Sequence, residues 1–398
     1  MNDYFVDLHI HIGKTERGAS VKISGASNLT FRNIAIEASE RKGIEVIGII
    51  DCASPNVQED IRNCLYSGEM VELPGGGIRY RDTVIILGSE IEVRDPGMGP
   101  AHLLTYFPSL ADMEAFSGWL KPHMKNSSLS TQRIRTTARE LQQEVKDRGG
   151  IVIPAHIFTP HKSLYGSCAD RMSEVLDTDG LAAVELGLSA DTSMASLILE
   201  LDPLPFVTNS DAHSLSKIGR EYNRLRMSSP SFNELIKALA GSRGRSIISN
   251  YGLSPRLGKY HRTYCESCAS VVDEQAASST DRAGMPDRCL YCGSKAIVRG
   301  VLDRITSIAN RTAPDPAIRR PPYHYQVPLE FIPGLGPKLL NKLHIRFGTE
   351  MNILHHVCLE DLENTVGEEI ARKIVLAREG ALQLDAGGGG RYGRVAKQ

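Results

Sequence analysis

The stretch FVDLHIHIG, residues 5–13, alternates polar and apolar side chains in the pattern of a β-strand. Successive side chains of a strand point to opposite faces, so Asp7, His9 and His11 share one face while Leu8 and Ile10 share the other. Two imidazoles therefore stand side by side near the start of the chain. Such a pair indicates either a metal site or an ordinary pair of core or surface histidines, and the rest of the sequence has to separate the two.

Composition limits the kind of protein. The chain has 398 residues, of which 41% are hydrophobic, enough for one large domain and one or two smaller ones. Because the formal net charge is −1, any nucleic-acid affinity has to come from local basic patches. A run of about 18 apolar residues does not occur, nor does the pattern of a secretory signal. We therefore expect a cytoplasmic protein with no membrane contact.

Four of the eight cysteines form a spaced pattern, in which the pairs CESC and CLYC are separated by twenty residues. Four thiolates at this spacing suit tetrahedral zinc in a closed structural site, and four unrelated cysteines or a redox pair are the alternatives. The segment between the pairs is polar, so metal binding would supply much of the folding free energy of this module, on the order of 10 kcal/mol. The sequence predicts one structural zinc, bound by Cys265, Cys268, Cys289 and Cys292.

Apolar runs that are typical of buried strands recur through the first 250 residues. Helical patterns at 30–43 and 131–150 lie between several of them, and this alternation predicts a parallel, barrel-like α/β domain. The Ser/Thr/Arg-rich stretch 128–139 fits either a loop over the active site or a capped amphipathic helix. The strands predicted after the first cover 43–51, 82–90, 101–107, 149–156, 180–186 and 204–213.

Polar side chains gather at or just after the C-terminal ends of these runs, where barrel enzymes place catalytic groups. His102 instead opens its run, and Glu16 follows the first strand by a few residues. Without a partner charge such a group would be costly at the mouth of an apolar barrel, and divalent metals offset that cost. Ordinary surface or loop residues are the alternative. The strand-end residues are Asp51, Glu90, His156, Asp211 and His213.

The motifs form an ordered series. They are DLHIHIG with His9 and His11, then Glu16, IIDC with Asp51, GSE with Glu90, AHLL with His102, PAH with His156, and SDAH with Asp211 and His213. This series resembles that of the PHP family of metal-dependent phosphoesterases. Glu16 stands where the family commonly has Asp, and Cys52 stands where many members have His. The second departure leaves open whether Asp51, Cys52 or neither binds metal.

The resemblance implies a PHP-type (β/α)7-like barrel that hydrolyses phosphate esters with a metal-activated water. It assigns His9, His11, Glu90 and Asp211 to one or two shared ions and to catalysis, with Glu90 as the bridging ligand. The metal set would be completed by Glu16, Asp51, His102, His156 and His213. Because mixed His and carboxylate ligands accept Zn, Mn, Fe or Mg, the identity of these ions stays open.

Beyond the cysteines, the Pro-rich stretch at 313–328 predicts an extended linker, and FIPGLGPKLLNKL at 331–343 looks like a helix-hairpin-helix element. Such a turn exposes backbone N–H groups to a DNA phosphate, so we expect Gly334, Gly336 and Lys338 to contact DNA. A plain helical hairpin, whose glycines only make the turn, is the alternative. The glycine-rich end of the chain, 385–398, is expected to be disordered.

A basic stretch precedes the zinc module and contains no Asp or Glu between residues 237 and 262. It could follow a phosphate backbone, with the interleaved tyrosines Tyr251, Tyr260 and Tyr264 stacking on bases, or it could form a solvated face. The candidate DNA-binding cations are Arg243, Arg245, Arg256, Lys259 and Arg262.

The order of these units resembles the endonuclease Q family over nearly the whole chain. The expected units are a PHP domain (1–250), a four-Cys module (251–310), a Pro-rich linker (311–328), a helix-hairpin-helix-like DNA-binding domain (329–384) and the tail (385–398). The resemblance implies a DNA repair endonuclease that cuts 5′ to a deaminated base (uracil, hypoxanthine, xanthine) or an abasic site, leaving 3′-hydroxyl and 5′-phosphate ends.

That activity would require extrusion of the damaged nucleotide, into a pocket that we expect barrel-edge loops and the zinc module to form together. The partner would be damaged DNA, single- or double-stranded. A sliding-clamp contact stays open, and a monomer is expected. The alternatives are a PHP phosphatase or exonuclease acting on nucleotides or DNA ends, and a non-catalytic protein that binds damaged DNA.

Overall fold

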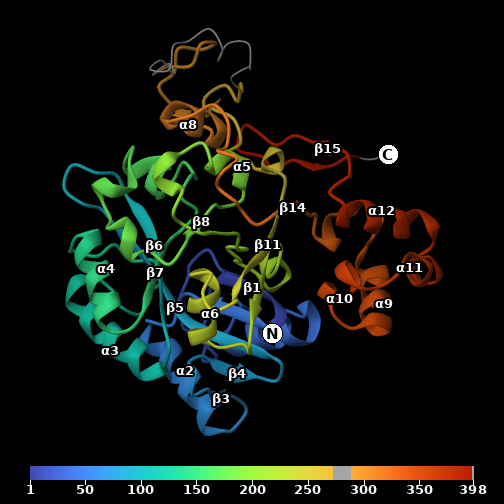
Figure 1. The fold of residues 1–398 in the computed structure, drawn as a ribbon, viewed down its shortest axis with the longest axis horizontal. Coiled ribbons are helices and arrows are strands. Elements are labelled where there is room, and N and C mark those ends of the chain that lie inside the picture. The colour runs from blue at the N-terminus through green and yellow to red at the C-terminus, as the bar shows by residue number, and fades with distance from the viewer. Residues whose placement is uncertain (272–287, 397–398) are drawn as a thin grey trace.

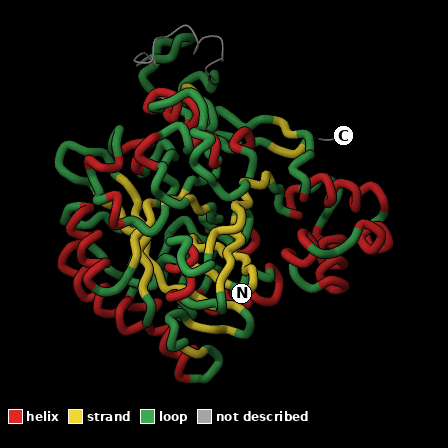
Figure 2. The backbone as a smooth tube through the Cα atoms, viewed as in Figure 1, coloured by secondary structure: helices red, strands yellow, loops and turns green. Residues whose placement is uncertain are grey.

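A computed structural model describes residues 1–271 and 288–396. One large sheet lies at its centre and helices lie mainly around it (Figure 1, Figure 2). The strands run in the order β14-β11-β10-β1-β2-β5-β4-β3, and β6 pairs with β5 and β7. Their bounds are β1 Asn2–Ile10, β2 Val46–Ile49, β3 Val71–Glu72, β4 Ile78–Tyr80, β5 Thr83–Val93, β6 Ala101–Phe107, β7 Ile151–Pro154, β10 Tyr222–Met227, β11 Ser246–Gly252 and β14 Tyr323–Tyr325.

The sheet is mixed, so the expectation of a parallel sheet is wrong in part. Strands β1, β2 and β5 are parallel, whereas β6 is antiparallel to β5, and β7 to β6. Only residues 94–100 separate β5 from β6, and a link this short leaves no room for the crossover helix that parallel neighbours require. Because β6 runs backwards, its first residues lie at the same end of the sheet as the last residues of β7. This explains why His102 opens its strand.

Two short parallel strands, β8 (Val184–Glu185) and β9 (Phe206–Val207), lie between β7 and β1. The N–H of Ala182, just before β8, donates to the carbonyl of Val152 in β7, and the N–H of His11 donates to the carbonyl of Ala212, after β9. These single bonds link the strands around the site, although no continuous ladder closes a barrel within the described residues. The C-terminal ends of β1, β2, β7, β8 and β9 are thereby brought together.

Both faces of the sheet are covered by helices. Val6 and Leu8 belong to a buried cluster that contains Phe232 and Leu235 of α6. Ile47 belongs to a second, larger buried cluster, which contains residues of the other helices. The helices of this region are α1 Phe31–Ile36, α2 Pro55–Tyr66, α3 Leu110–Leu120, α4 Ala138–Asp147, α5 Thr192–Ala195 and α6 Phe232–Leu239. None of the helices in the described ranges has the length and apolar character needed to cross a membrane.

Helix α4 begins later than the pattern at 131–150 predicts. Thr137 is its N-cap: its side chain accepts a hydrogen bond from the N–H of Glu140, whose own side chain accepts one from the N–H of Thr137. Such a capping box fixes the start of a helix. Residues before Thr137 are therefore a loop, as in one of the two interpretations of 128–139.

The second half of the chain adds two units. Strands β12 (Tyr264–Cys265) and β13 (Ile297–Val298) pair beside the cysteines and are followed by α8 (Val301–Ile308). A helical unit contains α9 Pro337–Phe347, α10 Glu350–His355, α11 Leu359–Val366 and α12 Glu368–Arg378. A buried ion pair between Lys42 and Glu350, 2.6 Å apart, attaches it to the large domain, and His355 stacks on Phe5.

The expectation that the tail is disordered is wrong for residues 385–396, and residues 397 and 398 lie outside the described ranges. Strand β15 (Leu384–Asp385) pairs with β16 (Arg394–Val395) in an antiparallel hairpin. Gly389 and Gly390, with φ of 59° and 77°, make the turn in a conformation that other residues avoid. The glycine-rich composition therefore marks a tight turn here.

Candidate metal centre and adjoining pocket

The candidate site lies where the strands converge. His9 and His11, at the end of β1, are buried with 0% and 1% of their surface exposed. His156 and Asp211 follow β7 and β9 and have positive φ, 30° and 45°. Non-glycine residues hold this conformation only where the surrounding structure forces it, and such strain often marks functional sites. Both side chains are thereby turned toward the histidines of β1.

Glu90 of β5 lies at the centre of the cluster and contacts it through both carboxylate oxygens. Its Oε1 is 2.9 Å from Nδ1 of His102, 3.5 Å from Nε2 of His156 and 3.7 Å from Nε2 of His9. Its Oε2 is 3.5 Å from Nε2 of His11. One carboxylate thus faces two pairs of imidazoles, which is the arrangement expected of a bridging ligand.

Asp211 completes the side nearest β1. Its Oδ1 lies 3.4 Å from Nε2 of His9, 3.5 Å from Nε2 of His11 and 3.5 Å from Nδ1 of His213. The structure therefore brings together six candidate ligands from five separate segments, and His213 lies at their edge. Three groups have ligand atoms close enough to share an ion: His9–His11–Glu90, His11–Asp211–His213 and Glu90–His102–His156.

These distances fit bound cations better than they fit hydrogen bonds. Most are longer than the usual N–H···O distance of about 2.9 Å. The buried Nε2 of His9 and both ring nitrogens of His102 have no hydrogen-bond partner among the described residues. Ligand atoms that each lie about 2.1 Å from one ion are roughly 3.0–3.5 Å apart, because tetrahedral and octahedral angles fix their separation. The donor set therefore fits divalent metal ions.

Two further carboxylates contact the Nδ1 atoms of His9 and His11, on the side of each ring that faces away from Glu90. Nδ1 of His9 lies 2.9 Å from Glu185 Oε2, and Nδ1 of His11 lies 3.1 Å from Asp51 Oδ2. Carboxylates placed in this way orient a metal-binding imidazole and fix its tautomer. The sequence analysis did not identify Glu185, although this residue ends β8.

The two positions that depart from the PHP pattern lie outside the cluster. Asp51 accepts hydrogen bonds from His11 and from the N–H of Ile12, so its carboxylate lies behind His11, away from the candidate ions. Cys52 donates to the carbonyl of Ile49 within the core, and burial raises the pKa of its thiol. Glu16 is exposed, and its backbone N–H donates to Asp60. The structure thus does not bring Glu16, Asp51 or Cys52 into any of the candidate metal groups.

A lysine that sequence reasoning missed contacts the centre of the cluster. Nζ of Lys22 lies 3.0 Å from Glu90 Oε2, and Thr131 donates to the same oxygen at 2.6 Å. Thr131 belongs to the loop before α4, so the interpretation of 128–139 as a loop over the site agrees with its position. Neither residue follows a strand or a motif, and only the folded chain brings them to Glu90.

The charged groups of the cluster also shift the pKa values of their neighbours. Burial by itself would lower the pKa of His9, but the facing carboxylates of Glu185 and Asp211 raise it to about 10. Burial would likewise raise the pKa of Glu90, yet His102 and Lys22 hold it well below its ordinary value. His9 therefore carries a proton when no cation is bound, and a divalent ion has to displace it.

A pocket of about 460 Å³ opens from the cluster. One wall consists of the candidate ligands His102, His156, Asp211 and His213. The rest of the lining is rich in cations and aromatic rings, namely Lys162, Lys217, Arg220, Lys259, Tyr260 and Tyr392. A pocket with a metal-binding wall and a cationic rim suits a phosphate-bearing ligand.

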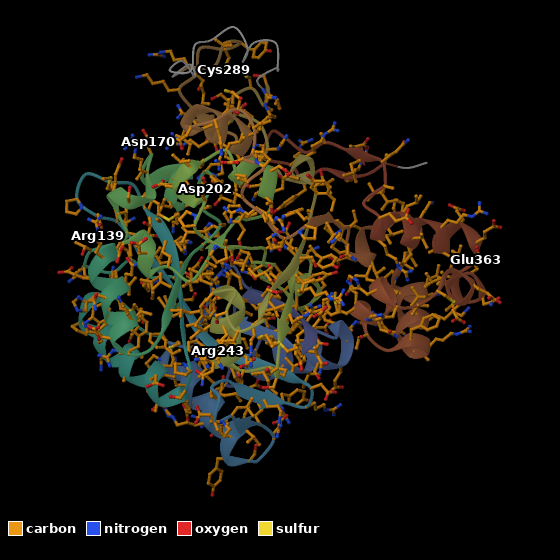
Figure 3. The ribbon with its side chains drawn as sticks, in the orientation of Figure 1. Arg139, Asp170, Asp202, Arg243, Cys289 and Glu363 are labelled. Carbon is orange, nitrogen blue, oxygen red and sulfur yellow. The ribbon has the colours of Figure 1, made fainter. Side chains whose placement is uncertain are left out.

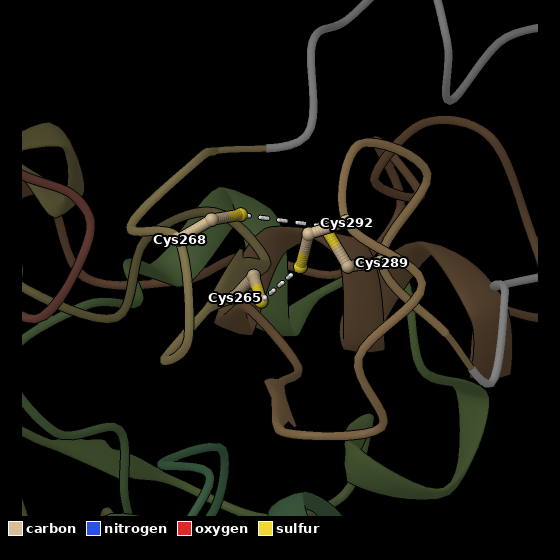
Figure 4. Close-up of side chains that lie close together, drawn as sticks. All are labelled: Cys265, Cys268, Cys289 and Cys292. Atoms are coloured by element: carbon tan, nitrogen blue, oxygen red, sulfur yellow. Dashed lines mark hydrogen bonds between the residues drawn. The ribbon is translucent and has the colours of Figure 1, made fainter.

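The four cysteines of the second module form a compact group (Figure 4). Sγ of Cys265 lies 3.6 Å from Sγ of Cys292, and Sγ of Cys268 lies 3.6 Å from Sγ of Cys289. Thiolates on a tetrahedral zinc, each at about 2.3 Å, are roughly 3.8 Å apart. The geometry therefore fits one structural zinc.

The predicted DNA-binding cations are dispersed. Of the basic stretch, Lys259 lines the pocket, whereas Arg245 pairs with Glu234 and Arg262 with Asp303. Arg243 and Arg256 are exposed, and Figure 3 shows Arg243 in the lower half of the view, far from Cys289 at the top. Lys162, Lys217 and Arg220, which no motif indicated, reach the pocket instead.

The glycine turn of the helical unit lies elsewhere on the surface. Gly334 has φ of 91°, and Gly336 is the N-cap of α9. Lys338 is exposed on the first turn of that helix. The exposed Lys338 is thus on the N-terminal end of α9, where a helix can bind phosphate.

Comparison with known proteins gives consistent matches. The PHP-associated family matches residues 195–243. The uncharacterized protein YqxK of Bacillus subtilis is 51% identical over 397 residues, covering 99% of this chain and 100% of that one. The uncharacterized protein MJ0043 of Methanocaldococcus jannaschii is 34% identical over 262 residues, covering 60% of this chain and 31% of that one.

Two solved structures match the whole fold. The lesion-specific endonuclease PfuEndoQ from Pyrococcus furiosus superimposes with a TM-score of 0.83 and 31% identity, covering 99% of this chain and 95% of that one. A complex of endonuclease Q with a 27-mer duplex that has an abasic lesion at the active site gives 0.83 and 30%, covering 100% and 97%. The expected family and the PHP-type α/β fold are confirmed: this chain belongs to the endonuclease Q family.

Proposed function

We propose that the protein is a DNA repair endonuclease that hydrolyses the phosphodiester 5′ to a deaminated base or an abasic site. The observation that carries the proposal is the direct opening of the candidate metal cluster into the pocket of about 460 Å³ with its cationic rim. In a relative of the same family, a duplex with an abasic lesion lies at the active site. The proposal includes deaminated bases because extruding a mispaired base from the duplex costs less free energy than extruding a paired one.

In this proposal the divalent ions would be held by His9, His11, Glu90, His102, His156 and Asp211. Bound divalent ions would supply Lewis-acid polarisation of the phosphate and a water molecule of lowered pKa. Zn, Mn, Fe and Mg are the candidates, with one structural zinc on the four cysteines. Glu185 and Asp51 are positioning residues, because each orients the imidazole that it contacts.

The remaining residues bind substrate and direct the bond change. Lys162, Lys217, Arg220 and Lys259 would bind the charged backbone on either side of the scissile phosphate. The oxygen of a water molecule forms a bond to phosphorus, and the bond from phosphorus to the 3′-oxygen breaks. The departing 3′-oxygen takes a proton, which His161 or His213 at the pocket wall can donate. The products are a 3′-hydroxyl and a 5′-phosphate.

We propose that the turn before α9 contacts the duplex at a second point, distant from the site of cleavage. The N–H groups after Gly336 and the exposed Lys338 offer one phosphate contact that is independent of sequence. Contacts of this kind position the DNA and carry no base specificity.

The test is a nicking assay on end-labelled duplexes that contain one deoxyuridine, one deoxyinosine, one abasic site or no lesion, with Mg or Mn present. Wild-type protein should give one nick 5′ to each lesion and none in undamaged DNA. Asp211→Ala should abolish the nick and leave DNA binding within about three-fold, because Asp211 contacts the ions and not the duplex. Asp170→Asn, an exposed residue paired with Arg304, is the matched control.

Other outcomes would replace the proposal. Nucleotides released progressively from the ends would indicate an exonuclease. Hydrolysis of small phosphate esters without cleavage of DNA would indicate a phosphatase. Binding of lesion DNA with no cleavage under any metal would indicate a damage-binding protein.

A further inference from the structure

Backbone hydrogen bonds hold the C-terminal hairpin, residues 384–396, beside the pocket. The N–H of Gly387 donates to the carbonyl of Arg256 at 2.7 Å, and the N–H of Gly393 donates to that of Leu257 at 2.9 Å. A Cβ on Gly387 would lie 2.6 Å from the nitrogen of Gly393, too close for any other residue. The glycines of the hairpin therefore allow two backbone segments to meet in close contact. Figure 1 shows the hairpin, in red, returning from the C-terminal helices toward α8.

This docking brings Tyr392 to the pocket that holds the candidate ligands. Nζ of Lys259 lies 4.7 Å from the ring centre of Tyr260 and 5.6 Å from that of Tyr392. One ammonium group is thus shared between two aromatic rings of the same wall. Tyr392 is 53% exposed, so it is accessible to a ligand in the pocket. An accessible aromatic ring beside a cationic pocket is the arrangement that proteins use to stack nucleobases.

We infer that Tyr392 is a specificity residue that stacks on the extruded base of the lesion nucleotide, so that the C-terminal hairpin completes the substrate pocket. The inference rests on the proposed function. Lys259 holds the two rings in place and faces the phosphate of the same nucleotide. Because stacking needs a base, the contribution of Tyr392 applies to uracil and hypoxanthine and is absent for an abasic site.

The test compares nicking efficiency, kcat/KM, on duplexes that carry one deoxyuridine or one abasic site. Tyr392→Ala should lower kcat/KM roughly ten-fold on the uracil duplex and less than about two-fold on the abasic duplex. Tyr392→Phe, which keeps the ring, should recover most of the loss. Tyr66→Ala, which removes a tyrosine that is 96% exposed on α2, is the control for the loss of a surface ring.

A direct binding measurement provides a second readout. In the inactive Asp211→Ala background, Tyr392→Ala should weaken binding of uracil DNA by a similar factor and leave binding of abasic DNA nearly constant. Equal losses on both duplexes would mean that Tyr392 only supports the fold of the hairpin, and no loss on either would mean that it does not touch the nucleotide. Both results overturn the inference while wild-type nicking still stands, whereas failure of the wild-type protein to nick would overturn the proposed function itself.

Discussion

Replacing Glu185 with glutamine tests how the candidate metal ligands are held. The carboxylate of Glu185 accepts hydrogen bonds from three donors: Nδ1 of His9 at 2.9 Å, the N–H of His156 at 2.9 Å and Nδ2 of Asn209 at 2.8 Å. Glutamine keeps the volume but has a single acceptor oxygen. Its NH₂ group must therefore face a donor, on either the Asn209 or the His156 side.

The expected size of the effect follows from this contact set. Losing one hydrogen bond to a charged group and leaving a buried donor unpaired costs about 1.5–3 kcal/mol. Carboxylates that orient a metal-binding histidine are typically worth 10–100-fold in metal affinity, which corresponds to about 1.4–2.7 kcal/mol. We therefore expect Glu185→Gln to weaken metal binding and nicking by at least roughly ten-fold.

The assay is a calorimetric titration of Mn²⁺ into protein that has been treated with a chelator to remove divalent ions, followed by nicking under saturating Mn²⁺. Glu200→Gln is the matched control, because Glu200 accepts from the hydroxyl of Tyr165 and the N–H of Met172 and contacts none of the cluster. Mn²⁺ affinity and nicking within about two-fold of wild type in Glu185→Gln would refute the positioning role.

Three further predictions concern stability and the zinc module. Burial raises the pKa of Glu221 to about 8, so the stability that its bound proton supplies is full below about pH 4.5 and is lost as the pH rises to about 8. Between pH 5 and pH 8, the free energy of urea unfolding should therefore fall by about 3 kcal/mol more in wild type than in Glu221→Gln, and equal slopes would contradict this. Lys42→Met should lower the free energy of unfolding by about 3–5 kcal/mol because it leaves buried Glu350 unpaired; recovery in the Lys42→Met/Glu350→Leu double variant checks the cause. Cys289→Ser should remove one zinc per chain, measured by plasma mass spectrometry, and lower Tm, whereas Cys358→Ser should do neither.

The ligand positions could be predicted from the sequence because strand geometry dictates them. His9 and His11 share a face through the two-residue period of β1, and His156 and Asp211 come within a few residues after the ends of β7 and β9. The position of Asp51 could not be settled in this way, because the sequence does not reveal on which side of His11 its carboxylate lies. Only the hydrogen bonds to His11 and Ile12 place it behind the imidazole.

Other parts of the site depend on contacts that a linear pattern does not contain. Lys22 and Thr131 are far apart along the chain, and both reach Glu90 through loops. The tail has the composition of a disordered segment, but its glycines allow a close backbone contact with residues 256 and 257. Composition reports the conformational freedom of a segment, whereas its docking depends on the surface that it meets.

Isotope labelling tests whether water hydrolyses the bond 5′ to the lesion, as we propose. Wild-type protein nicks a deoxyuridine duplex in H₂¹⁸O with Mn²⁺ present, and mass spectrometry is used to weigh both fragments. If water attacks phosphorus, we expect one ¹⁸O atom in the 5′-phosphate of the fragment that carries the lesion, and an unlabelled 3′-hydroxyl on the other fragment. An unlabelled 5′-phosphate, or ¹⁸O at the 3′-end, would show that the strand is broken by different chemistry.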